Sequence, residues 1–264
     1  MRLQLHSPLV LGRAILGGRL PLICVPLVGE SLAAVSAELR SLGGVAPDLF
    51  ELRMDAWDCT ASVAETMARL RAIRAATADT ALLLTCRHPR EGGLRPVPES
   101  VRLEVYGRAA REGLVALEDL ELSSGETVAA VRSALAGTGT KLILSAHDFA
   151  KTPSREAMRA ILDAELAAGA DVVKLAVMPT REEDVLALLE TALAFRRACP
   201  DTPQIAIAMG ELGMPSRLAG GHFGSDLTFA AGANASAPGQ MPLDVLRQSL
   251  EALYGKGTAG SQAH

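Results

Sequence analysis

Short apolar runs recur along the chain from Leu20 onward, and longer segments rich in alanine and leucine separate them. A continuous apolar run of this length is typical of a strand that is buried on both faces, as in a parallel sheet. The runs predict eight strands: Leu22–Val28, Leu49–Met54, Ala81–Cys86, Leu114–Glu121, Leu142–His147, Asp171–Val177, Gln204–Met209 and Ser225–Ala230. The segments between these strands are expected to be helices.

Eight strands that alternate with helices, without a linker break, predict a single-domain (β/α)8 TIM barrel over residues 1–264. A doubly wound open sheet is the alternative, but no G-x-G-x-x-G motif follows the first strand. Residues 1–19 hold three glycines among short apolar runs, which suits a hairpin at the bottom of the barrel. The last helix is expected at Leu243–Tyr254, and residues 255–264 are expected to form a disordered tail.

Local signals predict where several helices begin. Capping boxes combine a hydroxyl residue with a glutamate three positions later, and they occur at Ser62 with Glu65, Ser123 with Glu126, and Thr180 with Glu183. Thr152 is expected to cap a further helix, because Pro153 suits its first position, and Gly169 is expected to end it. That helix joins two parallel strands, with His147 ending the first and Lys174 inside the second.

Lys174 is an unusual residue for a buried strand. On a period of two, the face that suits packing under helices is formed by Val173, Leu175 and Val177. Lys174 lies on the opposite face, where Val172 and Ala176 leave room beside it. Desolvation lowers the pKa of an amine, and a neutral amine is a nucleophile toward carbonyls. A strand-end lysine whose side chain reaches water is the alternative.

Charge and composition exclude some classes of function. The net charge of −4 and the 3% aromatic content give no electrostatic or stacking basis for binding nucleic acid or an anionic membrane. The apolar run from Leu20 to Val28 is too short and too interrupted by proline to span a bilayer, and we expect no signal peptide. Four cysteines lie far apart without metal-ligand spacing, which favours a reducing cytoplasm, with Cys24 and Cys86 as core residues.

Charged residues gather at the C-terminal ends of the predicted strands, where a barrel collects its chemistry. In E-L-R-M-D, Glu51, Arg53 and Asp55 share one face, which is expected to point into the barrel mouth. An ordinary charged rim with local ion pairs is the alternative. The other polar residues at strand ends and in the loops after them are Arg87, Glu91, Asp119, Glu121, Arg217, Ser236 and Gln240. Asp119 and Glu121 could stabilise neighbouring cations instead of acting on a substrate.

His147 is the only histidine that ends a buried strand, and a histidine there suits a general acid or base near neutral pH. The inventory of one buried lysine, one histidine, several arginines and several carboxylates contains no histidine–carboxylate cluster that suggests a metal. It favours imine chemistry on an anionic, oxygen-rich carbonyl compound. In that chemistry Lys174 forms the imine and His147 moves protons.

These motifs together resemble type I 3-dehydroquinate dehydratase, the imine-forming lyase of the shikimate pathway of aromatic amino-acid biosynthesis. The matches run in order along nearly the whole chain. They are E-L-R-M-D at 51–55, T-C-R…E-G-G at 85–93, D-L-E at 119–121, S-A-H-D-F…T-P at 145–153, K-L-A-V-M-P at 174–179, S-R-L-A-G at 216–220, F-G-S at 223–225 and S-A-P-G-Q at 236–240.

The resemblance implies that Lys174 forms a Schiff base with the ketone of 3-dehydroquinate, that His147 moves protons and that Glu91 orients this histidine. It places substrate contacts on Glu51, Arg53, Arg87, Arg217, Ser236 and Gln240, with Arg217 as the carboxylate partner. It also implies a (β/α)8 enzyme that needs no cofactor and forms a homodimer, in the cytoplasm that the cysteines favour.

Two other functions are compatible with the same strand pattern. A class I aldolase-like lyase would also use a strand lysine, and it would need a phosphate-binding glycine loop, for which Gly220–Gly221 is a candidate. A catalytically silent barrel could instead bind a shikimate-type metabolite as a sensor. The presence of both Lys174 and His147 argues against a pure binding protein, because binding needs no nucleophile.

Overall fold

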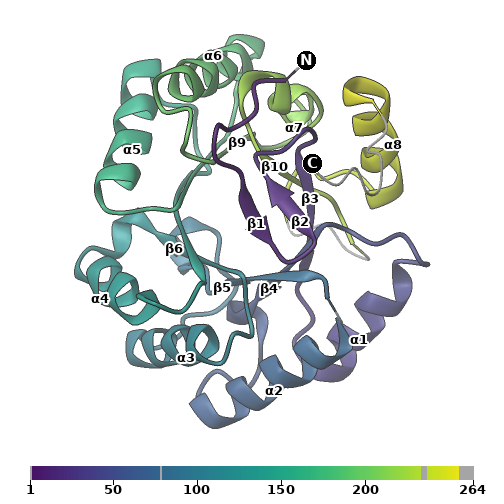
Figure 1. The fold of residues 1–264 in the computed structure, drawn as a ribbon, viewed down its shortest axis with the longest axis vertical. Coiled ribbons are helices and arrows are strands. Elements are labelled where there is room, and N and C mark those ends of the chain that lie inside the picture. The colour runs from purple at the N-terminus through teal and green to yellow at the C-terminus, as the bar shows by residue number, and fades with distance from the viewer. Residues whose placement is uncertain (1, 78, 233–236, 256–264) are drawn as a thin grey trace.

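The computed structural model describes residues 2–77, 79–232 and 237–255. Its main sheet has eight parallel strands in the order β10-β3-β4-β5-β6-β7-β8-β9 (Figure 1). Their bounds are Leu22–Leu27 (β3), Leu49–Arg53 (β4), Ala81–Thr85 (β5), Leu117–Glu121 (β6), Lys141–Asp148 (β7), Val172–Val177 (β8), Gln204–Ala208 (β9) and Leu227–Phe229 (β10). A parallel bridge between Gln204 and Ser225 brings the two edges together, so the sheet is a nearly closed barrel. The predicted (β/α)8 fold is confirmed.

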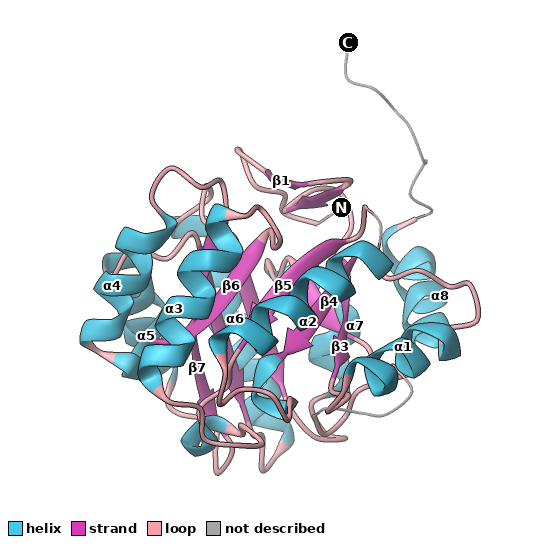
Figure 2. Cartoon of the chain, turned by 90° about the horizontal axis from the view of Figure 1, so that it is seen from below, coloured by secondary structure: helices cyan, strands magenta, loops and turns pink. Residues whose placement is uncertain are grey.

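Helices surround the strands on the outside of the barrel (Figures 1 and 2). They are Leu32–Ser41 (α1), Val63–Ala76 (α2), Glu99–Arg111 (α3), Glu126–Leu135 (α4), Arg155–Ala167 (α5), Glu182–Ala198 (α6), Met214–Ala219 (α7) and Leu243–Tyr254 (α8). The bounds of α8 agree with the prediction, and the expected tail beyond Gly255 lies outside the described residues. In the described chain, no helix combines the length and apolar character needed to cross a membrane.

Only one of the predicted caps takes the expected position. Ser62 caps α2 and accepts a hydrogen bond from the backbone N–H of Glu65. The cap of α5 is Ser154 and not Thr152, because the Ser154 hydroxyl accepts from the backbone N–H of Ala157 at 3.2 Å. The cap of α4 is Gly125 and not Ser123, and that of α6 is Arg181 and not Thr180. In both cases the predicted hydroxyl donates to a carboxylate instead, from Ser123 to Glu91 and from Thr180 to Asp184.

The strands separate two regions of the core. In β8, Val173, Leu175 and Val177 face outward and pack in the core cluster that also holds residues of α5 and α6. Val172 and Ala176 belong to the cluster inside the barrel. The predicted alternation of β8 is therefore confirmed, and it directs the side chain of Lys174 into the barrel. Cys24 and Cys86 are buried among core residues, as expected.

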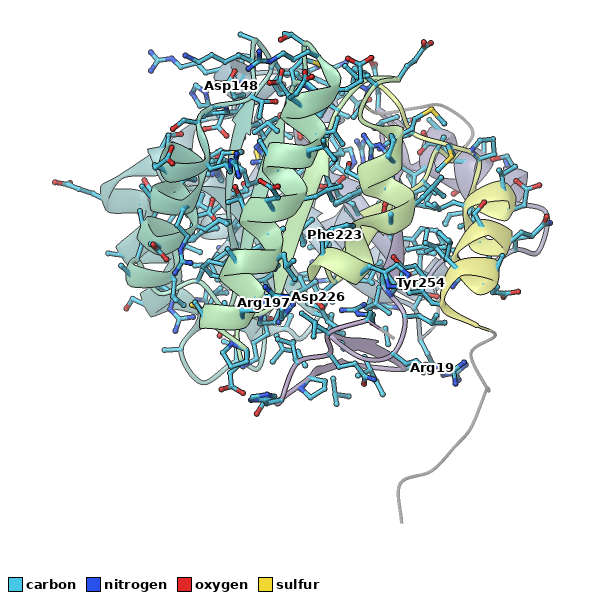
Figure 3. All side chains as sticks on the ribbon, turned by 90° about the horizontal axis from the view of Figure 1, so that it is seen from above. Arg19, Asp148, Arg197, Phe223, Asp226 and Tyr254 are labelled. Carbon is cyan, nitrogen blue, oxygen red and sulfur yellow. The ribbon has the colours of Figure 1, made fainter. Side chains whose placement is uncertain are left out.

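A hairpin covers one end of the barrel (Figure 2). Its strands, Leu9–Leu11 (β1) and Ala14–Leu16 (β2), pair antiparallel, and Leu11 and Leu16 are buried in the cluster inside the barrel. Arg2 forms a buried ion pair with Asp226, which directly precedes β10 and thus marks the N-terminal end of the strands. In Figure 3, Asp148 at the carboxyl end of β7 lies at the opposite end of the molecule. The hairpin therefore closes the bottom of the barrel, as predicted, and leaves the carboxyl end of the strands open.

Candidate active site

A cavity opens at the carboxyl end of the barrel. Most of its wall is made by residues at strand ends and in the loops that follow them: Glu51, Arg53, Arg87, Glu91, Gly92, His147, Phe149, Lys174, Ala176, Ile207, Met209, Arg217, Phe229, Ala237 and Gln240. Every residue that the resemblance assigned to the site and that the structure describes lines this cavity. Ser236 lies outside the described residues.

Lys174 lies in the wall of the cavity and is only 4% exposed. Its Nζ atom donates a hydrogen bond to Oδ2 of Asp119 at 2.7 Å and lies 4.9 Å from the centre of the Phe229 ring. The lysine thus faces the barrel interior and does not extend along the rim to water. The sequence suggested purely apolar surroundings for this lysine. The structure differs, because the carboxylate of Asp119 contacts the amine directly.

Asp119 is the centre of a buried charge network. Its Oδ1 accepts hydrogen bonds from Arg87 at 2.7 Å and from the Ser145 hydroxyl at 2.6 Å. Burial alone raises the pKa of Asp119, but the positive charges of Arg87 and Lys174 outweigh it and hold that pKa below its usual value. Asp119 is therefore ionised at neutral pH and balances the cations of the cavity wall.

Glu121 extends this network from the same face of β6. It accepts hydrogen bonds from Arg87 at 2.8 Å and from Arg102 at 2.5 Å. The expectation that Asp119 and Glu121 stabilise cations is confirmed. Both terminal nitrogens of Arg87 donate to protein oxygens, so the network fixes the position of this arginine. Arg87 also adds positive charge to the cavity.

His147 and Glu91 form a pair at the mouth. The distance between Nδ1 of His147 and Oε2 of Glu91 is 3.1 Å, and the backbone N–H of His147 donates to the same oxygen at 3.1 Å. The Ser123 hydroxyl donates to the other oxygen, Oε1, at 2.7 Å. Both carboxylate oxygens of Glu91 are therefore held, and this fixes the orientation of the imidazole.

The protonation state of His147 follows from its surroundings. Burial lowers its pKa well below the usual value, and the positive charges of Arg87 and Lys174 lower it further. The imidazole is thus neutral at neutral pH. With Nδ1–H donating to Glu91, the second ring nitrogen carries a lone pair, and His147 can act as a general base.

Arg217 differs from the other arginines of the cavity because no carboxylate among the described residues pairs with it. Arg217 lies in α7, its side chain is buried, with the residue 3% exposed, and it donates a hydrogen bond to the backbone carbonyl of Pro238 at 2.9 Å. Burial lowers its pKa to about 10, and its Nε atom has no hydrogen-bond partner in the part of the chain that is described. A buried guanidinium in this state is suited to bind an anion from outside the protein.

The remaining predicted residues have different surroundings. Glu51 faces the cavity and accepts a hydrogen bond from the Thr85 hydroxyl at 2.8 Å. Arg53 lines the cavity and pairs with Asp55 at 2.7 Å. Asp55 does not face the mouth, which contradicts the expectation for E-L-R-M-D. Strand β4 ends at Arg53 and a 3-10 turn follows over Met54–Ala56, so the two-residue alternation stops before Asp55.

Sequence reasoning missed several side chains that support the site. Ser145 lies in β7, two residues before His147, and contacts both Asp119 and Arg87. The alternation of β7 could have identified it, because Ser145 and His147 share one face of the strand. Phe229 in β10 and Ser123 gave no comparable signal. Among the described residues, no group of three or more histidine, cysteine, aspartate or glutamate side chains could hold a metal ion.

Comparison with known proteins identifies relatives of this chain. A profile of the type I 3-dehydroquinase family matches residues 23–256. The 3-dehydroquinate dehydratase of Aromatoleum aromaticum is 43% identical over 251 residues, which cover 92% of this chain and 94% of that protein. The corresponding protein of Geobacillus thermodenitrificans is 38% identical over 240 residues, or 90% of this chain and 93% of that one.

Solved structures agree with this result. The 3-dehydroquinate dehydratase of Geobacillus kaustophilus superimposes with a TM-score of 0.91 at 36% identity, covering 96% of this chain and 98% of that one. The type I enzyme of Clostridium difficile, whose structure carries covalently modified comenic acid, gives a TM-score of 0.89 at 34% identity over 94% of this chain and 98% of that one. The chain belongs to the type I 3-dehydroquinase family.

Proposed function

We propose that this protein is a lyase that dehydrates 3-dehydroquinate to 3-dehydroshikimate through a Schiff base on Lys174, in the shikimate pathway. The observation that carries the proposal is the cavity that joins a buried lysine amine, a neutral imidazole and an arginine without a carboxylate partner among the described residues. Membership of the type I 3-dehydroquinase family supports the same reaction.

In the first step Lys174 gives up a proton and its neutral amine attacks the substrate ketone. That proton is returned to the carbonyl oxygen, which leaves as water, and a protonated imine forms. The imine carries a positive charge close to Asp119, whose carboxylate lies 2.7 Å from Nζ of Lys174 in the free protein. Asp119 therefore stabilises the cation before and after the covalent bond forms. The imine withdraws electrons from the adjacent carbon and makes its proton removable.

His147 then takes the proton from that carbon, and the electron pair moves into the C–N bond to give an enamine. Glu91 supports the resulting imidazolium through its 3.1 Å contact with Nδ1. The electrons return to expel the substrate hydroxyl, which accepts the proton from the imidazolium of His147 and leaves as water. Hydrolysis of the imine releases the product and regenerates Lys174, so the net reaction is the loss of one water.

Substrate binding follows from the charges of the wall. We assign the substrate carboxylate to Arg217, because a charge-assisted hydrogen bond would satisfy its buried guanidinium. Glu51, Arg53 and Gln240 line the same cavity and can bind substrate hydroxyls. Arg87 supplies positive charge, and we assign Ser236 a further contact on the basis of the S-A-P-G-Q motif.

The proposal includes a homodimer in the cytoplasm, without a nucleic-acid or membrane partner. The separated cysteines and the net charge of −4 support this setting. Light scattering on the purified protein tests the dimer, and a single species at the mass of one chain, 27.6 kDa, would contradict it.

The aldolase-like alternative loses its phosphate-binding candidate. A Cβ atom added to Gly221 would lie 2.4 Å from Pro21 and 2.8 Å from the Tyr254 hydroxyl, and Pro21 directly precedes β3. Gly220 and Gly221 therefore lie toward the bottom of the barrel, on the side away from Lys174.

An ultraviolet assay tests the proposed function, because the conjugated enone of 3-dehydroshikimate absorbs where 3-dehydroquinate does not. We expect absorbance to rise with wild-type protein and with Lys141→Ala, which changes a lysine at the start of β7. No rise is expected with Lys174→Ala. The absence of a rise with folded wild-type protein would refute the dehydratase function. It would leave the catalytically silent sensor as the remaining alternative.

A further inference from the structure

The carboxylate of Asp55 accepts four hydrogen bonds, from one side chain and two backbone amides. It is fully buried in the 3-10 turn Met54–Ala56 that follows β4. Oδ1 accepts from Nε of Arg53 at 3.0 Å and from the backbone N–H of Arg87 at 3.1 Å. Oδ2 accepts from a terminal nitrogen of Arg53 at 2.7 Å and from the backbone N–H of Leu94 at 2.9 Å. Each carboxylate oxygen therefore accepts two hydrogen bonds.

Two of these donors mark the ends of one loop. Residues 87–94 form the loop that begins two residues after β5 ends at Thr85, and this loop contains a short 3-10 turn at Pro89–Glu91. Arg53, which Asp55 holds, also donates to the backbone carbonyl of Gly92 at 3.3 Å. The Asp55 carboxylate thus holds both ends of the loop by direct hydrogen bonds to two backbone N–H groups. It holds the middle of the loop indirectly, through Arg53.

This loop carries Glu91, and Glu91 contacts His147. Inside the loop the His88 carbonyl accepts from the backbone N–H groups of Glu91 at 2.9 Å and Gly93 at 3.1 Å, so the turn is a compact unit that its anchors place. Gly92 adopts a φ of +86°, a conformation that glycine reaches at no steric cost. The position of the Glu91 carboxylate relative to the imidazole therefore depends on how the ends of the loop are held.

We propose that Asp55 is a positioning residue for this reaction, which fixes loop 87–94 so that Glu91 orients His147. This inference rests on the proposed function. Asp55 does not line the cavity and touches no substrate in this account, so it acts through the loop. Through its ion pair with Arg53, it also connects the placement of Glu91 to a residue of the cavity wall.

A substitution that keeps the shape of Asp55 separates this role from simple packing. Asp55→Asn retains the size of the side chain but replaces one of the two accepting oxygens by an NH2 group, which cannot accept from a backbone N–H. One end of the loop, at Arg87 or at Leu94, then loses its partner. The matched control is Asp58→Asn, three residues further along, where the carboxylate pairs with Arg69 and is largely exposed.

The test is a double-mutant cycle on kcat with Asp55→Asn, Glu91→Gln and the double variant, measured at a temperature where each protein is folded. We expect Asp55→Asn alone to lower kcat about 10- to 100-fold, as expected when a catalytic group is misplaced by about an ångström. In the Glu91→Gln background the same change should have little further effect. Asp58→Asn should leave kcat unchanged.

An unchanged kcat in folded Asp55→Asn protein, or an equal loss in the Glu91→Gln background, would overturn the inference. If Asp55→Asn does not fold, Leu94→Pro removes the backbone N–H at one end of the loop and fixes the φ angle there, and it should lower kcat in the same Glu91-dependent way. A Leu94→Pro protein with full activity would also overturn it. Dehydration by the wild-type protein is measured in parallel, so a failure of the proposed function remains distinguishable from a failure of this inference.

Discussion

The Nζ atom of Lys174 lies 2.7 Å from Oδ2 of Asp119 inside the barrel, with both side chains almost fully buried. This contact explains how a strand can carry a lysine among apolar residues. An unpaired charge there would be strongly destabilising, whereas a paired and hydrogen-bonded one is tolerated. Asp119 also binds Arg87, so one carboxylate contacts two cations of the cavity wall, and Glu121 provides a second carboxylate for Arg87.

Removing the charge of Asp119 should therefore destabilise the protein. In Asp119→Asn, Lys174 loses its anionic partner and Arg87 keeps Glu121 as its paired carboxylate, and breaking a buried pair in this way costs about 3–5 kcal/mol. Urea unfolding measures the change. The control is Asp163→Asn, which breaks an exposed pair with Arg159 worth at most about 1 kcal/mol. Equal effects of the two substitutions would contradict the buried network.

Arg217→Ala should weaken substrate binding more than it slows the chemical step. The variant loses a charge-assisted hydrogen bond to the substrate carboxylate, typically about 1.5–3 kcal/mol, which corresponds to a rise in KM of about 10- to 100-fold. Steady-state kinetics with 3-dehydroquinate measures it. Arg197→Ala, which alters an exposed arginine of α6, is the control. An unchanged KM for Arg217→Ala would remove this residue from the substrate site.

The activity should persist at mildly acidic pH. The pKa of His147 lies well below its usual value, so the imidazole remains an unprotonated base as the pH falls through 6.5, where an ordinary histidine would gain a proton. A profile of kcat/KM between about pH 5 and 8 tests this. An acid limb centred at or above pH 6.5 that depends on His147 would contradict the expected protonation state.

Glu118 should limit the stability of the barrel without taking part in the reaction. It lies in β6, is fully buried, and neither of its carboxylate oxygens has a hydrogen-bond partner among the described residues. Glu118→Gln still leaves polar atoms to bury, whereas Glu118→Leu removes them and should stabilise the protein by about 1–3 kcal/mol at pH 7. Thermal or urea unfolding measures the difference, and Glu104→Leu, at an exposed position of α3, is the control.

The gain from Glu118→Leu should depend on pH. Burial raises the pKa of Glu118 well above its usual value. Because the pKa of Glu118 is higher in the folded protein than in the unfolded chain, protonation of this carboxyl favours the folded state. This contribution to stability is complete below the pKa of the unfolded chain, about 4.3, and it is lost as the pH rises toward the pKa of the folded protein. The advantage of the variant should therefore be smallest near pH 4 and grow toward pH 7. An advantage that shrinks over this range would contradict the assignment.

The sequence predicted those features that depend on local periodicity. The alternation of Val173, Lys174 and Leu175 is enough to place the lysine inside the barrel, because adjacent side chains of a strand point to opposite faces. The apolar runs located all eight strands of the main sheet to within a few residues. The residues of the cavity were identified mainly by their position at strand ends and by resemblance to a known family.

Features that depend on contacts between distant segments were not predictable in the same way. Ser123 fits a capping box in the sequence, but its hydroxyl binds Glu91, 32 residues away. Asp55 was expected in the mouth because the alternation of β4 was continued past Arg53, where the strand in fact ends. The packing of several loops decides which hydrogen-bond donors surround a buried carboxylate. No single stretch of sequence contains that information.

If Lys174 supplies the imine, borohydride reduction in the presence of substrate should trap it covalently on that residue. The protein is treated with 3-dehydroquinate and borohydride, and the modified peptide is identified by mass spectrometry. We expect an adduct on the peptide that contains Lys174 and none in Lys174→Ala. Trapping should persist in His147→Ala, whose dehydration rate should fall about 10²–10⁴-fold. An adduct on Lys141, Lys151 or Lys256, or full dehydration by Lys174→Ala, would contradict the mechanism.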